Sequence, residues 1–361
     1  MTENLKLIAE KFRIEGNIVS INPLGNGLIN DTYKVETDSG SGYVLQRINN
    51  AIFKDVDLLQ NNIMAVTSHI SAKLEAAGES DIDRKVLKFL TLKDSDSTYI
   101  EEDGMFWRVS AFIPNAFTYD TVNPEYSYFA GKAFGQFEAM LADLDEELGE
   151  TIPDFHNMEL RLNQLIDAVE NDAAGRVELD DVMDLLEDID AYGVEMCEAE
   201  RLYREGKLPK RICHCDTKVN NMMFDAEGNI LCVIDLDTVM PSFVFSDFGD
   251  FLRTAANTAA EDEPDTSKVS FDMEIFKSFA KGYIESAGAF LTDVEREHLP
   301  YAACMFPFMQ AVRFLADYIN GDTYYKIKYD DHNFVRARAQ MALFHSAMSH
   351  KDEMAAYISS L

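Results

Sequence analysis

The sequence predicts an α+β fold with two lobes: a small N-terminal lobe built on an antiparallel β-sheet and a larger, mainly helical C-terminal lobe. Before residue 114, much of the chain consists of short apolar stretches separated by turn residues, which is typical of strands. After about Pro124, apolar residues recur every three or four positions, which is the period of an amphipathic helix. We therefore expect lobes over residues 1–113 and 114–361.

The elements of each lobe follow from these patterns. In the first lobe, helices are expected over residues 5–12 and 55–77, and strands over residues 18–24, 28–35, 43–48, 85–92, 97–101 and 105–113. In the second, helices are expected over residues 129–141, 158–169, 179–203, 271–287 and 292–318, with another opening at residues 241–250 and one or two over 333–358.

The turn between the first two strands is Gly25-Asn26-Gly27. Asn-Gly is the strongest short signal for a hairpin, so a simple tight turn is one interpretation. The other is a glycine-rich loop whose backbone N–H groups lie over phosphate groups. The turn alone leaves both open.

Composition excludes several classes of partner and compartment. The 361 residues include 64 Asp and Glu but only 32 Lys and Arg, a net charge of −32, which argues against nucleic acid or an anionic membrane as partner. No apolar run approaches membrane-spanning length, and the first residues do not resemble a signal peptide. The five cysteines form no disulfide framework, which fits a reducing compartment. We expect a cytoplasmic protein with no obligate protein partner.

The stretch over residues 211–237 carries the densest chemistry. Two short apolar runs, 221–224 and 230–234, are separated by the turn cluster 225–229, which predicts a hairpin. A hairpin brings its ends together, so Asp216 and Asn221 should lie near Asp235 and Asp237. Like charges at such range repel by several kcal/mol, on the order of 1–4, unless a cation lies among them. Mg²⁺, which prefers oxygen ligands, is the cation that we expect.

The spacing His214-x-Asp216-x₄-Asn221, followed by a strand and Asp235, is the arrangement of kinase-type phosphotransfer sites. In such sites the first Asp accepts the proton of the substrate hydroxyl, while the Asn and the later Asp hold the metal. Asp237 could bind a second metal ion or act as a structural hydrogen-bond acceptor. The alternatives are a hairpin with solvated acids, or zinc at Cys213-His214-Cys215, whose spacing is too tight for the usual zinc pairs.

The other candidate residues remain ambiguous from spacing alone. A kinase would carry a phosphate-pairing Lys on the third strand, but this chain has Gln46 and Arg47 there, of which only one can face a nucleotide. Phe112 lies where the last strand enters a linker at which adenine usually docks. Lys218 is either an added positive charge at the site or a solvated loop residue, and Asp247 either caps a helix or braces the catalytic loop. Arg313 either clamps the substrate or pairs with Asp317, and Tyr324 belongs either to the core or to a pocket wall.

The chain resembles the aminoglycoside/choline phosphotransferase branch of the protein-kinase-like fold, and more closely the N-acetylhexosamine 1-kinases. The strings that carry the resemblance run nearly from end to end: residues 25–33, 43–53, 107–108, 214–221, 234–241, 247–250, 261–263 and 313–324. Within them, Asp-Thr-Lys-x-Asn-Asn at 216–221 and Arg-Phe-Leu-Ala-Asp-Tyr at 313–318 are specific to that subfamily.

The resemblance implies ATP- and Mg²⁺-dependent phosphorylation of the anomeric 1-hydroxyl of N-acetylglucosamine or N-acetylgalactosamine. By position, Asp216 is the base, Asn221 and Asp235 are the metal ligands, and the sugar is held by Arg313 and Tyr324. Relatives also carry Gln at the position of Gln46, but they can carry His where this chain has Leu28, which leaves the preferred sugar open. The alternatives are a kinase of another small alcohol, such as an amino alcohol, an aminoglycoside or a different sugar, and a catalytically silent nucleotide-binding module.

Overall fold

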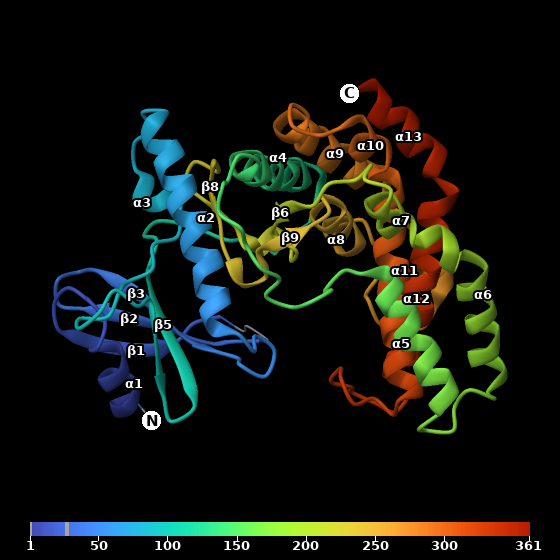
Figure 1. Ribbon diagram of the computed structural model, residues 1–361, viewed down its shortest axis with the longest axis horizontal. Coiled ribbons are helices and arrows are strands. Elements are labelled where there is room, and N and C mark those ends of the chain that lie inside the picture. The colour runs from blue at the N-terminus through green and yellow to red at the C-terminus, as the bar shows by residue number, and fades with distance from the viewer. Residues whose placement is uncertain (1, 26–28, 121) are drawn as a thin grey trace. The chain divides into compact units, whose positions relative to one another are not determined.

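A computed structural model describes residues 2–25, 29–120 and 122–361 (Figure 1). The chain divides into two compact units, each discontinuous in sequence. The first, called here the sheet unit, comprises residues 1–119, 143–153 and 220–240; the second, the helical unit, comprises residues 120–142, 154–219 and 241–361. The predicted α+β class is confirmed by a five-stranded antiparallel sheet and a larger helical part. The predicted lobe boundary at residue 113 stays a prediction.

The sheet unit is built on five strands in the order β1-β2-β3-β5-β4. They are β1 (Ile18–Pro23), β2 (Asp31–Thr37), β3 (Gly42–Ile48), β4 (Tyr99–Glu102) and β5 (Met105–Ala111), accompanied by helices α1 (Thr2–Ala9), α2 (Val56–Ala76) and α3 (Ile82–Lys85). Every neighbouring pair in the sheet is antiparallel. The period-two pattern and turn residues of the sequence therefore predicted this sheet correctly, apart from one segment.

That segment is residues 85–92, which were expected to form a strand. Ile82–Lys85 forms a short helix instead, and Phe89 makes only an isolated bridge with Ser110. The reason lies in β5: one edge of β5 pairs with β3, and β4 occupies the other edge as far as Arg108. Only the end of β5 remains free for this segment, which is too short for a strand.

The two faces of the sheet differ in chemistry. Leu45 and Val109 are fully buried on the face that packs with Ile8 and Phe12 at the N-terminus. Burying one such side chain contributes roughly 1.5–3 kcal/mol. Because successive strand residues point to opposite faces, the neighbouring positions Gln46 and Arg108 lie on the other face, directly opposite each other across β3 and β5. A polar pair is thus fixed in register on the second face.

The helical unit surrounds one apolar helix. Its helices are α4 (Pro124–Leu141), α5 (Met158–Asn171), α6 (Asp180–Met196), α7 (Glu198–Arg204), α8 (Phe245–Ala255), α9 (Met273–Ala287), α10 (Asp293–Glu297), α11 (Leu299–Ile319), α12 (His332–Ser349) and α13 (Lys351–Ser360). Nearly all of α11 is buried, against α5, α8 and α12 (Figure 1). Among the described residues no helix is long and apolar enough to cross a membrane.

Two helices that the sequence predicts as continuous are each divided. The helix predicted over 179–203 is interrupted at Cys197, between α6 and α7. The helix predicted over 292–318 is interrupted at His298, because Pro300 lies in the first turn of α11. Proline lacks the N–H that a continuing helix would need, but it fits the first turn of a new helix.

Helices α4 and α9 cross at unusually short range because glycines lie at the crossing. A Cβ atom added to Gly131 would lie 2.1 Å from the carbonyl oxygen of Phe279, and one added to Gly282 would lie 2.1 Å from that of Tyr128. No side chain fits at such distances, so the two backbones are in direct contact. The crossing fixes the position of the residues that follow it on each helix, including Glu138 and Tyr283.

Candidate active site

A short hairpin carries two of the predicted metal ligands. Strands β7 (Met222–Phe224) and β8 (Ile230–Val233) pair with Met222 opposite Val233, and the N–H of Ile234 donates to the carbonyl oxygen of Asn221 at 2.9 Å. Asn221 and Asp235 therefore lie at the same end of the hairpin. The hairpin expected from the turn residues is confirmed.

Asp235 has the backbone and exposure of a functional residue. It lies in the left-handed region, with φ of 63°, and its side chain is exposed. That conformation costs a non-glycine residue about 1–2 kcal/mol and is concentrated at functional sites. The carboxylate of Asp235 and the amide oxygen of the buried Asn221, two residues at the same end of the hairpin, are a donor set that suits Mg²⁺. The residues present thus fit the expected metal ion.

Asp237 lies in a different environment from Asp235. It is 4% exposed, its Oδ1 lies 2.5 Å from Arg108 Nη2, and its Oδ2 accepts a hydrogen bond from Asn30 Nδ2 at 2.6 Å. An ion pair and an amide donor therefore occupy both oxygens. These contacts favour the structural interpretation of Asp237 over a second metal site.

Arg108 connects Asp237 to the polar face of the sheet. It is 2% exposed, and its Nε donates to Gln46 Oε1 at 3.0 Å, while Gln46 Nε2 donates to Thr32 Oγ1 at 3.2 Å. Arg47, by contrast, forms an ion pair with Asp31 on the exposed side. Of the two residues that the sequence left open, Gln46 is the one beside a buried cation.

Sequence reasoning did not assign a role to Arg108. Its Nη1 atom is buried and has no hydrogen-bond partner among the described residues. A detectable signal was present, because an arginine between Trp107 and Val109 in an apolar strand must find a counter-charge. A buried guanidinium from β5 thus lies next to Gln46 of the third strand.

The glycine turn and the linker position are only partly described. Asn26, Gly27 and Leu28 lie outside the described residues, whereas Gly25 has a φ of +71° that favours glycine. Phe112 follows β5, and its N–H donates to the carbonyl oxygen of Gly42 at 3.0 Å. The predicted nucleotide contacts of this turn and of Phe112 stay predictions.

In the helical unit, Asp247 holds the loop that carries Asp216. Asp247 is fully buried on α8; its Oδ2 accepts from the N–H of His214 at 2.8 Å and its Oδ1 from that of Cys215 at 2.7 Å. Thr217 Oγ1 adds a hydrogen bond to the carbonyl oxygen of Asp247 at 2.8 Å. Burial raises the pKa of Asp247, and the two N–H groups oppose that rise. Of the two roles considered for Asp247, these contacts show the brace.

The loop presents Asp216 from a constrained backbone. Cys215 has a φ of 62°, and the buried ring of His214 accepts a hydrogen bond from the N–H of Asp216 at 3.3 Å through Nδ1. The side chain of Asp216 is 29% exposed, and its Oδ2 lies 2.8 Å from the ammonium group of Lys218. Lys218 is thus an ion-pair partner of the predicted base.

Zinc does not fit the cysteines of this loop. Burial raises the pKa of the Cys213 and Cys215 thiols well above the usual range. Zinc binds thiolates, which such burial disfavours. Cys213 Sγ instead donates to the carbonyl oxygen of Phe243 at 3.3 Å.

Arg313 is not the local partner of Asp317. Asp317 accepts from the backbone N–H groups of Thr323, Tyr324 and Tyr325 at 2.8–2.9 Å. The i+4 pair, one of the two interpretations left open by the sequence, is therefore not formed. Arg313 Nη1 donates to Gln310 Oε1 at 3.2 Å, and its guanidinium lies 5.8 Å from the centre of the Phe155 ring. The exposed ring of Tyr324 packs on that of Tyr325, with centres 4.8 Å apart.

A second arginine, which sequence reasoning did not single out, lies near Arg313. Arg161 Nη2 donates to the carbonyl oxygen of Phe155 at 2.6 Å, and its buried Nε has no partner among the described residues. Burial and the charge of Arg313 lower the pKa of Arg161 to about 10. Burial and three neighbouring arginines also hold the pKa of His156 well below its usual value.

Arg161 and Arg313, called here the arginine pair, form no ion pair within the described residues, although Arg253 nearby pairs with Asp250 and Glu261. Two partly buried cations without a carboxylate are unfavourable unless oxygen atoms of a ligand reach them. The arginine pair is therefore a candidate binding site for an oxygen-rich molecule.

The site residues are thus distributed over both units. Asp216, Lys218, Asp247 and the arginine pair belong to the helical unit, and Asn221, Asp235 and Gln46 belong to the sheet unit. The predicted convergence of Asp216 with the two metal ligands stays a prediction.

Three solved structures to which the chain is similar are named as a phosphotransferase or as kinases. The chain is similar to an aminoglycoside phosphotransferase from Alicyclobacillus acidocaldarius subsp. acidocaldarius DSM 446, with a TM-score of 0.60 and 10% identity over 99% of this chain and 96% of that one. It is similar to the amicoumacin kinase hAmiN in complex with AMP-PNP, Ca²⁺ and Ami, with a TM-score of 0.59 and 13% identity over 89% and 87%. A choline kinase from Cryptosporidium parvum Iowa II gives a TM-score of 0.58 and 12% identity over 99% and 98%.

At such low identity these likenesses show the fold. The family follows from a separate comparison with protein-family models. The match extends over residues 20–298, which includes the hairpin, the braced loop and the polar face of the sheet. The chain therefore belongs to the phosphotransferase enzyme family.

Proposed function

We propose that this phosphotransferase transfers the γ-phosphoryl group of ATP to the anomeric 1-hydroxyl of an N-acetylhexosamine. The observation that carries the proposal is the arginine pair, neither member of which forms an ion pair among the described residues, and in which the buried Nε of Arg161 has no hydrogen-bond partner there. Guanidinium groups donate hydrogen bonds to hydroxyl and carbonyl oxygens, which an N-acetylhexosamine offers on every side. A neutral, oxygen-rich acceptor satisfies both arginines.

The same pair disfavours a cationic acceptor. A positive group about 4 Å from a guanidinium is repelled by roughly 1–4 kcal/mol near a protein surface. Choline and aminoglycosides are cations, so this local repulsion opposes their binding. The net charge of −32 attracts cations only at long range, where salt screens it.

In the proposed reaction Asp216 accepts the proton of the acceptor hydroxyl as its oxygen attacks the γ-phosphorus. The bond between the γ-phosphorus and the bridging oxygen of the β-phosphate breaks, and ADP leaves. An anomeric hydroxyl is more acidic than an ordinary alcohol, so a carboxylate suffices as base. Asp247 supports this step, because it fixes the backbone on both sides of Cys215 and so the direction in which Asp216 projects. Positioning of this kind contributes much of the rate enhancement in phosphoryl transfer.

Asn221 and Asp235 would hold Mg²⁺, whose charge neutralises the phosphate oxygens of the nucleotide. On the sheet unit, Arg108 and Gln46 supply further donors on the face where the third-strand Lys of a kinase would lie. The buried, unpartnered Nη1 of Arg108 supports a role in binding phosphate. Arg313 and Tyr324 would contact the sugar, with Arg161 as an additional donor.

A kinase of another small alcohol remains the second candidate, since the similar structures include kinases named for choline and amicoumacin. A silent nucleotide-binding module is opposed by the presence of Asp216, Asn221 and Asp235 together.

The test is a panel of acceptors assayed with ATP and Mg²⁺: N-acetylglucosamine, N-acetylgalactosamine, choline and an aminoglycoside. The position of phosphorylation is read from the phosphorus–proton coupling in the NMR spectrum of the product. We expect 1-phosphates from both sugars and little turnover of the two cations. Faster turnover of a cation, or a sugar 6-phosphate as product, would overturn the proposal.

A further inference from the structure

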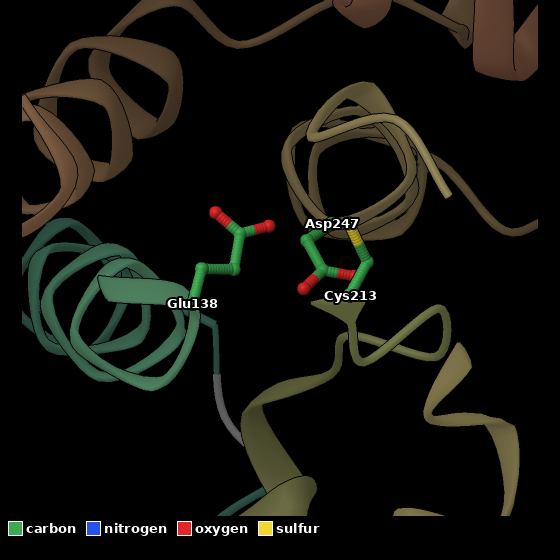
Figure 2. A group of neighbouring side chains, drawn as sticks. All are labelled: Glu138, Cys213 and Asp247. Atoms are coloured by element: carbon green, nitrogen blue, oxygen red, sulfur yellow. The ribbon is translucent and has the colours of Figure 1, made fainter. Parts of the chain in front are cut away.

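Three buried side chains, one of them the Asp247 that holds the loop of Asp216, lie close together (Figure 2). They are Glu138 of α4, which is 2% exposed, Asp247 of α8, and Cys213 at the end of β6 (Arg211–Cys213), both fully buried. One oxygen of each carboxyl group and the Cys213 sulfur all lie within 4.8 Å of one another. Two ionised carboxylates at this distance and depth would repel strongly, so the cluster must contain a proton or a cation.

The hydrogen bonds identify the group that carries the proton. Both oxygens of Asp247 accept backbone N–H groups, which requires acceptors there. Glu138 Oε2 accepts a hydrogen bond from the hydroxyl of Tyr283, but Glu138 Oε1 is buried and, taken as a carboxylate oxygen, has no partner among the described residues. A proton on Glu138 removes this deficiency, because its O–H can donate to Asp247.

We propose that Glu138 is a buried carboxylic acid that donates a hydrogen bond to Asp247 and thereby positions the Asp216 loop. Glu138 is a positioning residue, since it acts through Asp247 and the backbone of His214 and Cys215. The expected effect of Glu138 on turnover rests on the proposed function, in which Asp216 is the base. The protonation state of Glu138 does not depend on that proposal.

No cation among the described residues forms an ion pair with Glu138, although the charge of Arg211 reaches it. Tyr283 on α9 and Cys213 on β6 face it, and burial raises the pKa of both groups well above their usual values, so both are neutral. Arg211 of β6 is occupied by Glu295, with Arg211 Nε 2.9 Å from Glu295 Oε1. Burial and the charge of Asp247 raise the pKa of Glu138 well above its ordinary value, in agreement with the hydrogen bonds. A metal ion would instead need a Cys213 thiolate, whereas this thiol donates to the carbonyl oxygen of Phe243.

The fold makes the arrangement specific. The glycine crossing of α4 and α9 brings Tyr283 within hydrogen-bonding range of Glu138. Glu138 also has a matched counterpart in Glu200 of α7, a buried acid that accepts from the N–H of Met158 at 2.6 Å. Burial raises the pKa of Glu200 too, but its described contacts do not involve the loop. Substitutions at Glu200 therefore control for the loss of a buried acid as such.

The experiment compares Glu138→Gln and Glu138→Met with Glu200→Gln and Glu200→Met. Glutamine keeps a donor toward Asp247 and an acceptor for Tyr283, so we expect kcat within about twofold of the parent enzyme. Because glutamine does not ionise, any fall of kcat at high pH that is caused by ionisation of Glu138 should be absent in this variant. Methionine keeps the volume but not the donor, so we expect kcat to fall about tenfold or more at unchanged KM. Glu200→Met should keep kcat per folded molecule. Equal losses in Glu138→Gln and Glu138→Met, or in the two methionine variants, would overturn the proposal.

Two measurements do not require an active enzyme, so they test the protonation of Glu138 independently of the proposed function. At about pH 8 the infrared spectrum should contain a protonated carboxylic acid band that Glu138→Gln removes. Hydrogen exchange at the amides of His214 and Cys215 should accelerate in Glu138→Met, provided that it folds, but not in Glu200→Met. A missing infrared band, or bound metal that is lost in Glu138→Gln by elemental analysis, would overturn the proposal even if the enzyme is active. Absence of any phosphorylated acceptor would instead count against the proposed function.

Discussion

The two units stabilise a buried aspartate in different ways. In the sheet unit, Asp237 is held by the guanidinium of Arg108 and the amide of Asn30. In the helical unit, Asp247 is held by two backbone N–H groups and, in our proposal, by a neutral acid, Glu138. The first arrangement balances a negative charge with a positive one. The second depends on one proton, so pH and a single substitution should distinguish the two regions.

The largest effect, a loss of kcat, is expected at Asp216, the residue whose loop Asp247 holds. Asp216→Asn removes the proposed base while keeping its size, so kcat should fall by about 10²–10⁴-fold with the free energy of unfolding nearly unchanged. Steady-state kinetics and urea unfolding measure the two quantities. The control is Asp293→Asn, at an exposed position at the start of α10. Near-normal turnover in Asp216→Asn would remove the assignment of the base.

The charge-balanced side of the comparison is tested by Arg108→Met. This variant leaves the carboxylate of Asp237 buried beside Asn30 alone, so we expect a loss of about 3–5 kcal/mol in the free energy of unfolding. The double variant Arg108→Met with Asp237→Asn should recover part of that loss. Arg47→Met is the matched control, because Arg47 pairs with Asp31 on the exposed side and should contribute only about 0–1 kcal/mol. A loss of equal size in both single variants would contradict the importance of burial.

The proton-dependent side is tested by the pH dependence of stability. The ordinary pKa of Glu is 4.5, and burial raises that of Glu138 in the folded chain. Between these two values the folded state holds one proton more than the unfolded state. Stability is therefore fully present below about pH 4.5 and falls as pH rises, by up to about 1.4 kcal/mol per pH unit, until the folded pKa is passed.

Glu138→Gln should remove that component from the plot of unfolding free energy against pH, whereas Glu200→Gln removes only the component of Glu200. Urea unfolding at several pH values is the measurement. An unchanged slope in Glu138→Gln would show that Glu138 is ionised in the folded protein.

The smallest expected effect concerns the arginine pair. Arg313→Met should raise KM for N-acetylhexosamines by about tenfold, the loss expected for one charge-assisted hydrogen bond. It should also reduce the difference in KM between N-acetylhexosamines and choline, because one positive charge that repels choline is removed. Arg338→Met, at an exposed position of α12, should change neither quantity. An unchanged KM in Arg313→Met would place the acceptor elsewhere.

Local chemistry explains what the sequence predicted well. The turn at residues 225–229 predicted the hairpin because Asp225 Oδ1 accepts the N–H groups of Glu227 and Asn229 within a few residues. For the third strand, alternation predicted only that Gln46 and Arg47 lie on opposite faces, and it took the register of β3 and β5 to place Gln46 beside Arg108.

The failures have in common a partner that is distant in sequence. Nothing near Arg108 shows that its counter-charge is Asp237, and nothing near Arg313 shows that Asp317 is already occupied by backbone N–H groups. Glu138 left a weaker signal, as an acid on the same helix face as Phe134 and Leu141. An acid on an apolar face predicts a buried polar network but not its members.

The crossing of α4 and α9 limits which substitutions the chain tolerates at its glycines. Gly131 and Gly282 have no side chain and take no direct part in the proposed chemistry, yet a single methyl group at either position would collide with the opposite backbone. The helices would have to separate, and the hydroxyl of Tyr283 would move away from the acid beneath the loop. Selection for fast turnover therefore constrains Gly131 and Gly282, although neither residue carries a reactive group.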